Sequence, residues 1–317
     1  MTTLAEIREK LAAAEANSNR EVDNSIYPFW NLKDGQESVV RFLPDGDESN
    51  IFFWVERQLI KLPFVGVKGT DDTKEYVVQV PCNEMYNGEC PILSTVRPWF
   101  KSPELEDIAR RYWKKRSYVF QAFVVQDGLE EEQKPDNPIR RLIITPKVFQ
   151  LVRSALLDPE LDELPTDYVH GLDFRIKRTS SGKYADYTTS TWARKERPLS
   201  QAERDAIEEH SLYNLSTFLP KQPSAEELGV IKDMFEASVD GLPYDLEAWG
   251  KFYKPYGLEA PSQQSENSES TRKPKPTATP AVQSKPVAKQ EPSEPEETGD
   301  SRAQDILKMI RNRQTTS

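Results

Sequence analysis

Hydrophobic and polar residues alternate along several short stretches of the chain, which is the pattern of strands with one buried face. The clearest stretch is Ser117–Gln126, where Tyr118, Phe120 and Ala122 fall on one face. The other predicted strands cover residues 38–44, 51–55, 76–80 and 139–145, and residues 172–177 and 184–192 are expected to form a hairpin turning at 180–183. Short strands with few helices among them predict a mainly β fold with peripheral helices (α+β), built as a small barrel or sandwich.

A period close to that of an α-helix predicts the helical segments. They cover residues 3–16, 146–157, 201–209, 224–236 and 243–251. In the second of these, Val148, Leu151, Val152 and Leu156 form one apolar stripe. The helices near residues 200–255 are therefore expected to pack on the outside of the barrel.

The composition changes after Gly257. Residues 261–292 are rich in Pro, Ser, Gln, Lys and Thr and carry almost no large apolar side chains, so we expect them to be disordered. This predicts three regions: an N-terminal arm at 1–24, a core at 25–257 with a cysteine-containing subdomain at about 45–115, and a disordered acidic tail at 258–317. The tail ends in a short amphipathic helix with Ile306, Leu307 and Ile310 on one face. This helix is either a partner-docking peptide or an end without a role.

Charge and motif content exclude several classes of protein. The net charge is −10 and the chain contains two cysteines and two histidines. The cysteines are too few for a disulfide scaffold, and the sequence shows neither a membrane-length apolar run nor a signal peptide, so we expect a cytoplasmic protein. Motifs of phosphate-binding loops, serine hydrolases and zinc proteases are absent, and we therefore expect no enzyme activity.

Basic and aromatic residues are interleaved between Arg97 and Phe120. This window holds seven basic and three acidic residues, a local balance of +4 in a chain of net charge −10. Cations bind phosphates and flat rings stack on unpaired bases, so the pattern predicts a surface for single-stranded nucleic acid. The alternative is that the rings belong to the core and the cations to a solvated helix face. The candidate residues are Arg110, Arg111, Tyr112, Trp113, Lys114, Lys115, Arg116 and Tyr118.

Further candidates lie outside this window. The predicted hairpin carries Arg175, Lys177, Tyr184, Tyr187 and Trp192. In a half-buried strand, Arg175 and Lys177 point outward together. Arg140 and Arg141 form a third small cluster, and Arg41 is a lone cation in an apolar strand, where it either binds nucleic acid or lies at an exposed edge.

Three stretches of the chain resemble a known family. They are residues 29–33 with 35–44 (Phe-Trp-Asn-Leu-Lys and Gly-Gln-Glu-Ser-Val-Val-Arg-Phe-Leu-Pro), then Cys82 to Ile92 with its second cysteine at Cys90, then 114–118 followed by 123–127. Their order and spacing resemble those of the single-stranded DNA-binding (helix-destabilising) protein of T-even-type phages. The resemblance covers residues 1–255.

The resemblance implies an oligonucleotide-binding (OB) barrel with an adjoining small subdomain. It also implies cooperative coating of single-stranded DNA in replication, recombination and repair, in the cytoplasm of an infected host cell. The arm would then contact neighbouring copies, and the acidic tail would dock replication and recombination proteins. The cleft residues that it implies are Arg41, Lys114, Lys115, Arg116, Tyr118, Tyr184 and Tyr187.

The resemblance also implies a zinc site with three cysteines and one histidine. Cys82 and Cys90 match two of these ligands, but Leu93 stands where the third cysteine would be, and residues 45–90 contain no histidine. We therefore expect a degraded site without zinc. Two other functions stay open, an RNA-binding regulator and a replication scaffold that acts through its tail.

Overall fold

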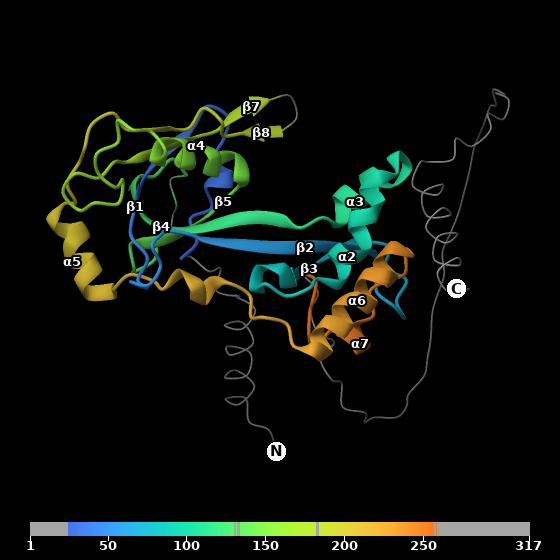
Figure 1. The fold of residues 1–317 in the computed structure, drawn as a ribbon. Helices are drawn as coiled ribbons and strands as arrows, with labels where there is room; N and C mark the ends of the chain where they lie inside the picture. The colour runs from blue at the N-terminus through green and yellow to red at the C-terminus, as the bar shows by residue number, and fades with distance from the viewer. Residues whose placement is uncertain (1–24, 130, 132–133, 182–183, 257, 259–317) are drawn as a thin grey trace, which may run out of the picture. The chain divides into compact units, whose positions relative to one another are not determined.

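The chain forms two compact units in a computed structural model, which describes residues 25–129, 131, 134–181, 184–256 and 258 (Figure 1). Unit 1 comprises residues 25–60, 81–89 and 114–223. Unit 2 comprises residues 61–80, 90–113 and 224–258. The predicted arm and the predicted tail helix with Ile306, Leu307 and Ile310 lie outside the described residues.

Unit 1 is built on an antiparallel sheet that confirms the mainly β prediction. Strand β1 (Glu37–Phe42) pairs with β4 (Lys115–Gln126) on one side and with β6 (Phe174–Lys177) on the other. β4 also pairs with β5 (Ile139–Ile144) and with the first residues of β2 (Val55–Val65), and β6 pairs with β9 (Thr191–Trp192). The register sets Phe42 opposite Ala122 and Val40 opposite both Val124 and Phe174.

One side of this sheet carries the main core. Its buried side chains include Phe42 of β1, Phe120 of β4 and Phe174 of β6. By the period of two, their neighbours Arg41 and Gln121 belong to the other side of the sheet, where they are buried as well. Helix α4 (Pro146–Leu156) adds Val148, Phe149 and Val152 to the same core, while its other face stays in solvent. The helix begins at Pro146, a residue favoured at the first helical position because its fixed φ is already helical.

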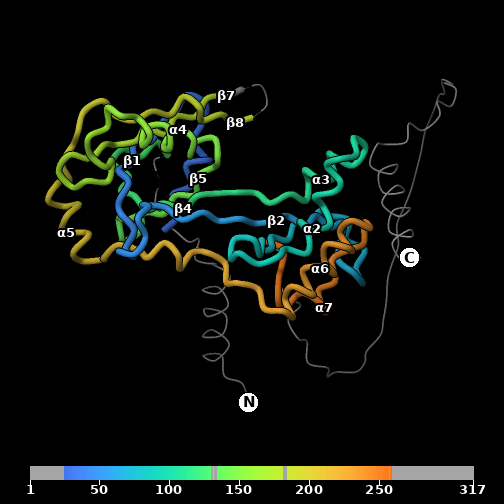
Figure 2. Tube along the Cα trace, viewed as in Figure 1, coloured from blue at the N-terminus to red at the C-terminus, as the bar shows by residue number. Residues whose placement is uncertain are grey.

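A short hairpin follows β6. Strands β7 (Thr179–Ser181) and β8 (Tyr184–Asp186) pair only with each other, and Figure 2 traces the hairpin beside α4. The segment η1 (Phe29–Asn31) also belongs to this end of the unit, because the ring of Tyr187 lies edge-on to Phe29 at 5.5 Å.

The opposite side of the sheet has a smaller core under helix α5 (Gln201–His210). Leu43, Phe123 and Ile139 pack there with Leu199 and Ala206. The helix begins with a capping box in which Ser200 and Glu203 exchange hydrogen bonds. The segment η5 (Leu215–Phe218) lies next to β4, where buried Gln121 donates to the carbonyls of Pro44 and Tyr213.

A buried ionic network ties these elements together. Arg41 of β1 is fully buried, and its guanidinium donates to the carbonyl of Asp167 at 2.7 Å and lies 3.3 Å from Asp173. Asp173 also binds Arg197 at 2.8 Å, and Arg197 binds Glu203 of α5 at 2.8 Å. Gly171 is required beside this network, since a Cβ there would lie 2.4 Å from Arg41 and 2.3 Å from the Asp167 carbonyl oxygen.

Unit 2 combines the end of β2 and most of β3 (Glu75–Pro81) with short helices. These helices are α2 (Pro91–Val96), η3 (Arg97–Lys101), η4 (Pro103–Leu105), α3 (Glu106–Tyr112), α6 (Ala225–Val239) and α7 (Leu246–Trp249). Trp99 and Tyr112 both pack on Phe235 of α6, with ring centroids 5.9 and 5.2 Å away. Phe64 packs on Tyr244 and on Trp249, so the strands and the α6–α7 region share one core.

Several predicted elements differ from the structure. The strand expected at 51–55 is instead the connection that leads into β2. The expected pairing of 172–177 with 184–192 is confirmed in part, where β6 pairs with β9, while β7 and β8 form a separate hairpin. The helices between residues 91 and 112 and the segment η2 (Asn83–Tyr86) were not predicted. Residues 45–60 belong to unit 1 and residues 224–258 to unit 2, so the subdomain boundaries also differ from the predicted 45–115.

Replacing Asp173 by Ala is expected to destabilise unit 1. The substitution leaves Arg41 buried without its carboxylate, and breaking such a pair costs about 3–5 kcal/mol of unfolding free energy. Urea unfolding followed by tryptophan fluorescence measures this loss. The control is Lys221→Ala, an exposed lysine of the same unit, which should change stability by less than about 0.5 kcal/mol. Equal stability of the two variants would contradict the structural role of the network.

The Glu203 carboxylate should make stability depend on acid pH. Burial raises the pKa of Glu203, but hydrogen bonds from Arg197 and Ser200 outweigh it and hold the pKa below its ordinary value of 4.5. Because the folded protein binds this proton less readily than the unfolded chain, the stabilisation is complete above pH 4.5 and is lost as the pH falls through the lower folded-state pKa. Below pH 4.5 the unfolding free energy of the wild type should therefore fall more steeply than that of Glu203→Gln. If the unfolding free energies of the wild type and of Glu203→Gln fell equally with pH, Glu203 would make no such contribution to stability.

Candidate nucleic-acid interface

Arg41 does not reach the surface. Its side chain is fully buried in the ionic network with Asp173, and burial lowers its pKa below the ordinary value. β1 is flanked on both sides by other strands, so Arg41 is not an exposed edge residue either. Both expectations for Arg41 are therefore corrected, and the residue stabilises the fold.

Four further candidates have buried side chains. Tyr112 packs on Phe235 and its hydroxyl lies 3.0 Å from that of Ser238. Tyr118 is only 7% exposed and stacks on Phe149 at 3.6 Å. Lys114 and Arg140 are ion-paired, with Glu84 and Glu131 respectively, each at 2.8 Å. None of the four offers an open face to a base or a phosphate in this conformation.

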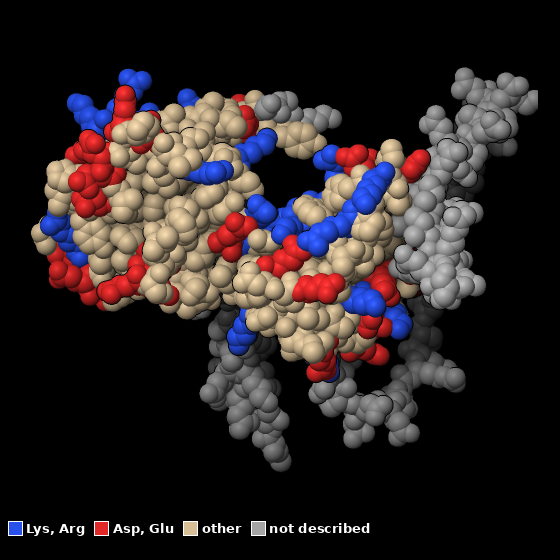
Figure 3. All heavy atoms as spheres, in the orientation of Figure 1, with Lys and Arg blue, Asp and Glu red and all other residues tan. Residues whose placement is uncertain are grey.

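The basic-aromatic window from Arg97 to Phe120 is divided between the two units. Trp113 and the residues before it belong to unit 2, and Lys114 and those after it belong to unit 1. In unit 2, Arg110 and Arg111 are exposed on α3, Arg110 pairs with Glu106, and Trp113 lies edge-on to Phe100 at 5.1 Å. Figure 3 shows basic side chains gathered along α3. A nucleic-acid role for this helix stays a prediction.

In unit 1, the outward face of β6 carries two predicted cations. Arg175 is 55% exposed and lies 3.4 Å from Glu37, and Lys177 is half-buried on the same face. Arg175 borders a cavity of about 370 Å³ that is also lined by Arg194 and Trp192. Trp192 turns its ring toward the core, at 4.9 Å from Phe174. Arg141 is also held inside the unit, over the ring of Phe218 at 3.8 Å.

The β7–β8 hairpin presents the most open aromatic side chain of the predicted set. Tyr184 is 80% exposed. Tyr187 is half-buried against Phe29, and burial raises its pKa. The hydrogen bond from the Thr188 hydroxyl lowers the pKa of the Asp186 carboxyl most, and the charge of Lys147 on α4 lowers it further, so this exposed lysine lies near β8.

A second group of rings and cations lies further along α4. Phe149 of α4 packs between Tyr118 and half-buried Trp54, whose ring is 5.2 Å away. Burial and the nearby Glu56 raise the pKa of Tyr118, while Arg116 and Arg153 oppose this rise. Arg116 is 51% exposed and pairs with Glu56 at 3.4 Å, and Arg153 is exposed on α4. Both guanidinium groups lie near enough to Tyr118 to act on its pKa.

These two groups define what we call the α4 surface. It consists of Trp54, Arg116, Lys147, Arg153, Tyr184 and Tyr187, all in unit 1. Sequence reasoning found Arg116, Tyr184 and Tyr187 and missed the other three. Lys147 and Arg153 were detectable as cations on the polar face of a helix whose apolar stripe was recognised, but no charge cluster surrounds either of them.

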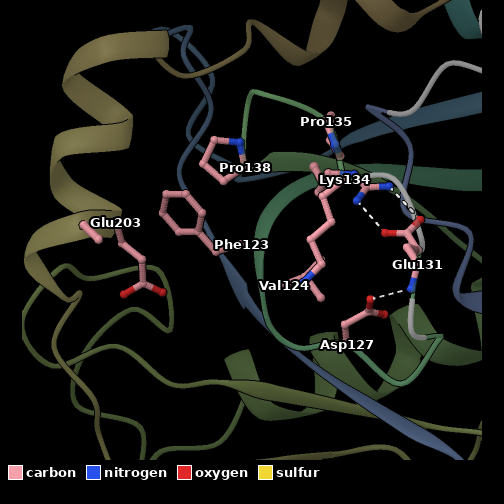
Figure 4. Close-up of a pocket in the computed structure, with 10 residues that line it drawn as sticks. Phe123, Val124, Asp127, Glu131, Lys134, Pro135, Pro138 and Glu203 are labelled. Atoms are coloured by element: carbon pink, nitrogen blue, oxygen red, sulfur yellow. Dashed lines mark hydrogen bonds and ion pairs between the residues drawn. The ribbon is translucent and has the colours of Figure 1, made fainter.

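A separate pocket near α5 has charged and apolar walls. Its volume is about 300 Å³, and Figure 4 shows Glu131 in it, bonded to Asp127. Arg140 pairs with Glu131 at 2.8 Å, and Lys134 also lines the pocket. Phe123, Val124 and Pro138 form the apolar part, and none of the lining residues belongs to the α4 surface.

Metal ligation finds no support in the described part of the chain. No three His, Cys, Asp or Glu side chains gather there as a metal site would require. Cys82 and Cys90 are buried thiols, and buried Leu93 lacks a ligand atom, so these residues do not fit a zinc site. Within residues 25–258, as far as described, no helix is long and apolar enough to cross a bilayer.

No protein-family model matches the chain, and no curated protein matches it.

Chemical modification should separate exposed from buried tyrosines. Tetranitromethane attacks the phenolate, so it is expected to nitrate the exposed Tyr184 and Tyr256 and to leave Tyr112 and Tyr118 unmodified in the folded protein. The raised pKa of Tyr118 slows its reaction further. Peptide mass spectrometry after a short reaction with the reagent measures the order in which the tyrosines are nitrated. Nitration of Tyr118 before Tyr184 would contradict the described burial.

Proposed function

We propose that this protein binds single-stranded DNA across the α4 surface. The observation that carries the proposal is the grouping of exposed cations and accessible rings around one helix. Arg116, Lys147 and Arg153 provide positive charge for phosphates. Flat faces for unpaired bases are offered by exposed Tyr184 and by the accessible parts of the half-buried Tyr187 and Trp54. The combination favours a strand whose bases are not already paired.

The net charge of −10 does not conflict with this proposal. Binding depends on where charges lie, and a local group of cations can attract phosphates on an acidic protein. It does imply a short contact, because Arg140 of β5 and Lys114, which precedes β4, are each paired with a carboxylate. We therefore expect moderate affinity that falls steeply with salt.

We further infer that the barrel of unit 1 is of the OB type. Strands β1, β4 and β5 precede a helix, α4, and β6 and β9 follow it, with β1 paired to β6. In OB folds the loops between the first two strands and between the last two bind oligonucleotides. Trp54 lies in the first of these connections, and Tyr184 and Tyr187 lie in the second. Cooperative coating through residues 1–24 and partner docking through the tail remain predictions.

Titration with an oligo-dT at several salt concentrations tests the proposal. The double variant Lys147→Ala/Arg153→Ala should bind more weakly, and its log–log salt slope should be shallower by about 1.4 if each cation meets one phosphate. Tyr184→Ala should lose about 1–3 kcal/mol of binding free energy through one lost stacking contact. Both substitutions are at exposed positions, so folding should not change.

Lys221→Ala is the matched control, because it also removes an exposed charge from unit 1. Its affinity and salt slope should equal those of the wild type. The proposal is overturned if the wild type does not bind oligo-dT, or if the control and the α4 variants behave alike. An RNA oligomer of equal length bound with equal affinity would extend the ligand to single-stranded nucleic acid in general.

A further inference from the structure

The outward face of the sheet in unit 1 holds a cavity of about 370 Å³. The strand register builds its floor, because Arg175 of β6 lies opposite Val39 of β1 and opposite Thr191 of β9. Residues that face each other across antiparallel strands point to the same side of the sheet, whereas the neighbouring Phe174 points into the main core on the other side. We call this cavity the β6 pocket, and its lining includes Val39, Asp173, Arg175, Thr191, Ala193 and Arg194.

The carboxylate that lines the β6 pocket is already balanced by cations inside the unit. Asp173 lies 3.3 Å from the guanidinium of Arg41 and 2.8 Å from that of Arg197. Its side chain is only 13% exposed. Because two buried or half-buried arginines bind this carboxylate, it does not cancel the charge of Arg175 and Arg194 in the pocket.

Arg175 and Arg194 are therefore available to a ligand. Arg175 is 55% exposed, and its ion pair with Glu37 at 3.4 Å is a surface contact of the kind that contributes little to stability. Arg194 is exposed, and no carboxylate in the described part of the chain pairs with it. Thr191 is exposed too, so its hydroxyl adds a donor to the same face. Two guanidinium groups and a hydroxyl suit an anion with several acceptor oxygens.

The number of cations and the size of the cavity narrow the choice of anion. Two guanidinium groups favour a dianion, and a phosphate monoester carries about −1.5 to −2 charges at neutral pH and has three acceptor oxygens. A phosphodiester within a strand carries one charge. The cavity lies at the lower end of the range of small-molecule sites, about 300–1,000 Å³. Val39 and Ala193 add apolar wall for the rest of the ligand, so the space suits a single nucleotide.

We propose that the β6 pocket binds the phosphate monoester of a nucleotide, held by Arg175 and Arg194. A free nucleotide and the 5′-phosphorylated end of a DNA strand both present this group. None of the lining residues named above belongs to the α4 surface, so the pocket is a second site. The proposal goes beyond the proposed single-strand binding and does not depend on it.

Isothermal titration calorimetry with thymidine 5′-monophosphate tests the pocket on the full chain. The wild type should bind this nucleotide and should not bind thymidine, which lacks the phosphate. Arg175→Ala/Arg194→Ala should weaken binding of the nucleotide by about tenfold or more, through the lost charged hydrogen bonds. Both arginines are exposed, so the near-ultraviolet circular dichroism of this variant should match that of the wild type. Lys221→Ala and Lys147→Ala/Arg153→Ala should bind the nucleotide as the wild type does.

Two oligo-dT strands, one with a 5′-phosphate and one with a 5′-hydroxyl, identify the source of the phosphate. Tighter binding of the phosphorylated strand, lost in Arg175→Ala/Arg194→Ala, assigns the pocket to strand ends. Equal binding of the two strands, with the nucleotide bound, assigns it to free nucleotides. The proposal is wrong if the wild type binds neither the nucleotide nor the 5′-phosphate, if thymidine binds equally well, or if the double arginine variant binds like the wild type. Loss of oligo-dT binding alone would contradict only the α4 surface.

Discussion

The burial of one arginine constrains unit 1 more than any other interaction. Arg41 sits in the middle strand of the sheet, where an unpaired charge would be too costly to keep. Its partners come from far along the chain, the Asp167 carbonyl and the Asp173 carboxylate, and Asp173 in turn holds Arg197, which binds Glu203. Asp173 immediately precedes β6, so satisfying Arg41 also fixes where β6 meets β1 and where the chain departs into the β7–β8 hairpin. The position of the hairpin tyrosines therefore depends on a charge buried in the sheet.

Whether a cation is buried and paired or exposed to solvent decides whether it is available to bind a phosphate. Cations that meet carboxylates inside the unit, such as Arg41, Lys114 and Arg140, stabilise the fold. Lys147 and Arg153 are exposed on the solvent side of α4, whereas Arg116 pairs with Glu56. Of the nearby rings, Trp54 and Tyr187 are half-buried against the core and Tyr184 is 80% exposed. A ring that the core supports loses little entropy when a base stacks on its open face, and this would favour Trp54 and Tyr187 as stacking sites if the proposed surface binds DNA.

Local pattern in the sequence predicted β4, β5 and α4 almost to their ends, because apolar residues recur in each with a clear period. It also selected Tyr184, Tyr187 and Arg116 as candidates, whose binding role stays a prediction. It could not show that Arg41 is covered, since residues 165–173 reach it only through tertiary contacts. Tyr112 was proposed as a binding residue, but it is buried together with Leu105 and Ile108 on one side of the helical segment. The many charged residues around it concealed this helical spacing of apolar positions. Single cations such as Lys147 and Arg153 could not be recognised as candidates from the sequence, because only the fold shows which aromatic side chains lie near them.

Photochemical crosslinking tests the central claim most directly. An oligo-dT with 5-iodouracil at successive positions, irradiated in complex with the full chain and digested for mass spectrometry, reports which aromatic side chains touch the bases. The α4 surface predicts crosslinks at Trp54, Tyr184 or Tyr187, at levels that fall as salt is raised. Crosslinks confined to peptides that contain none of these residues would contradict the assignment of the binding surface.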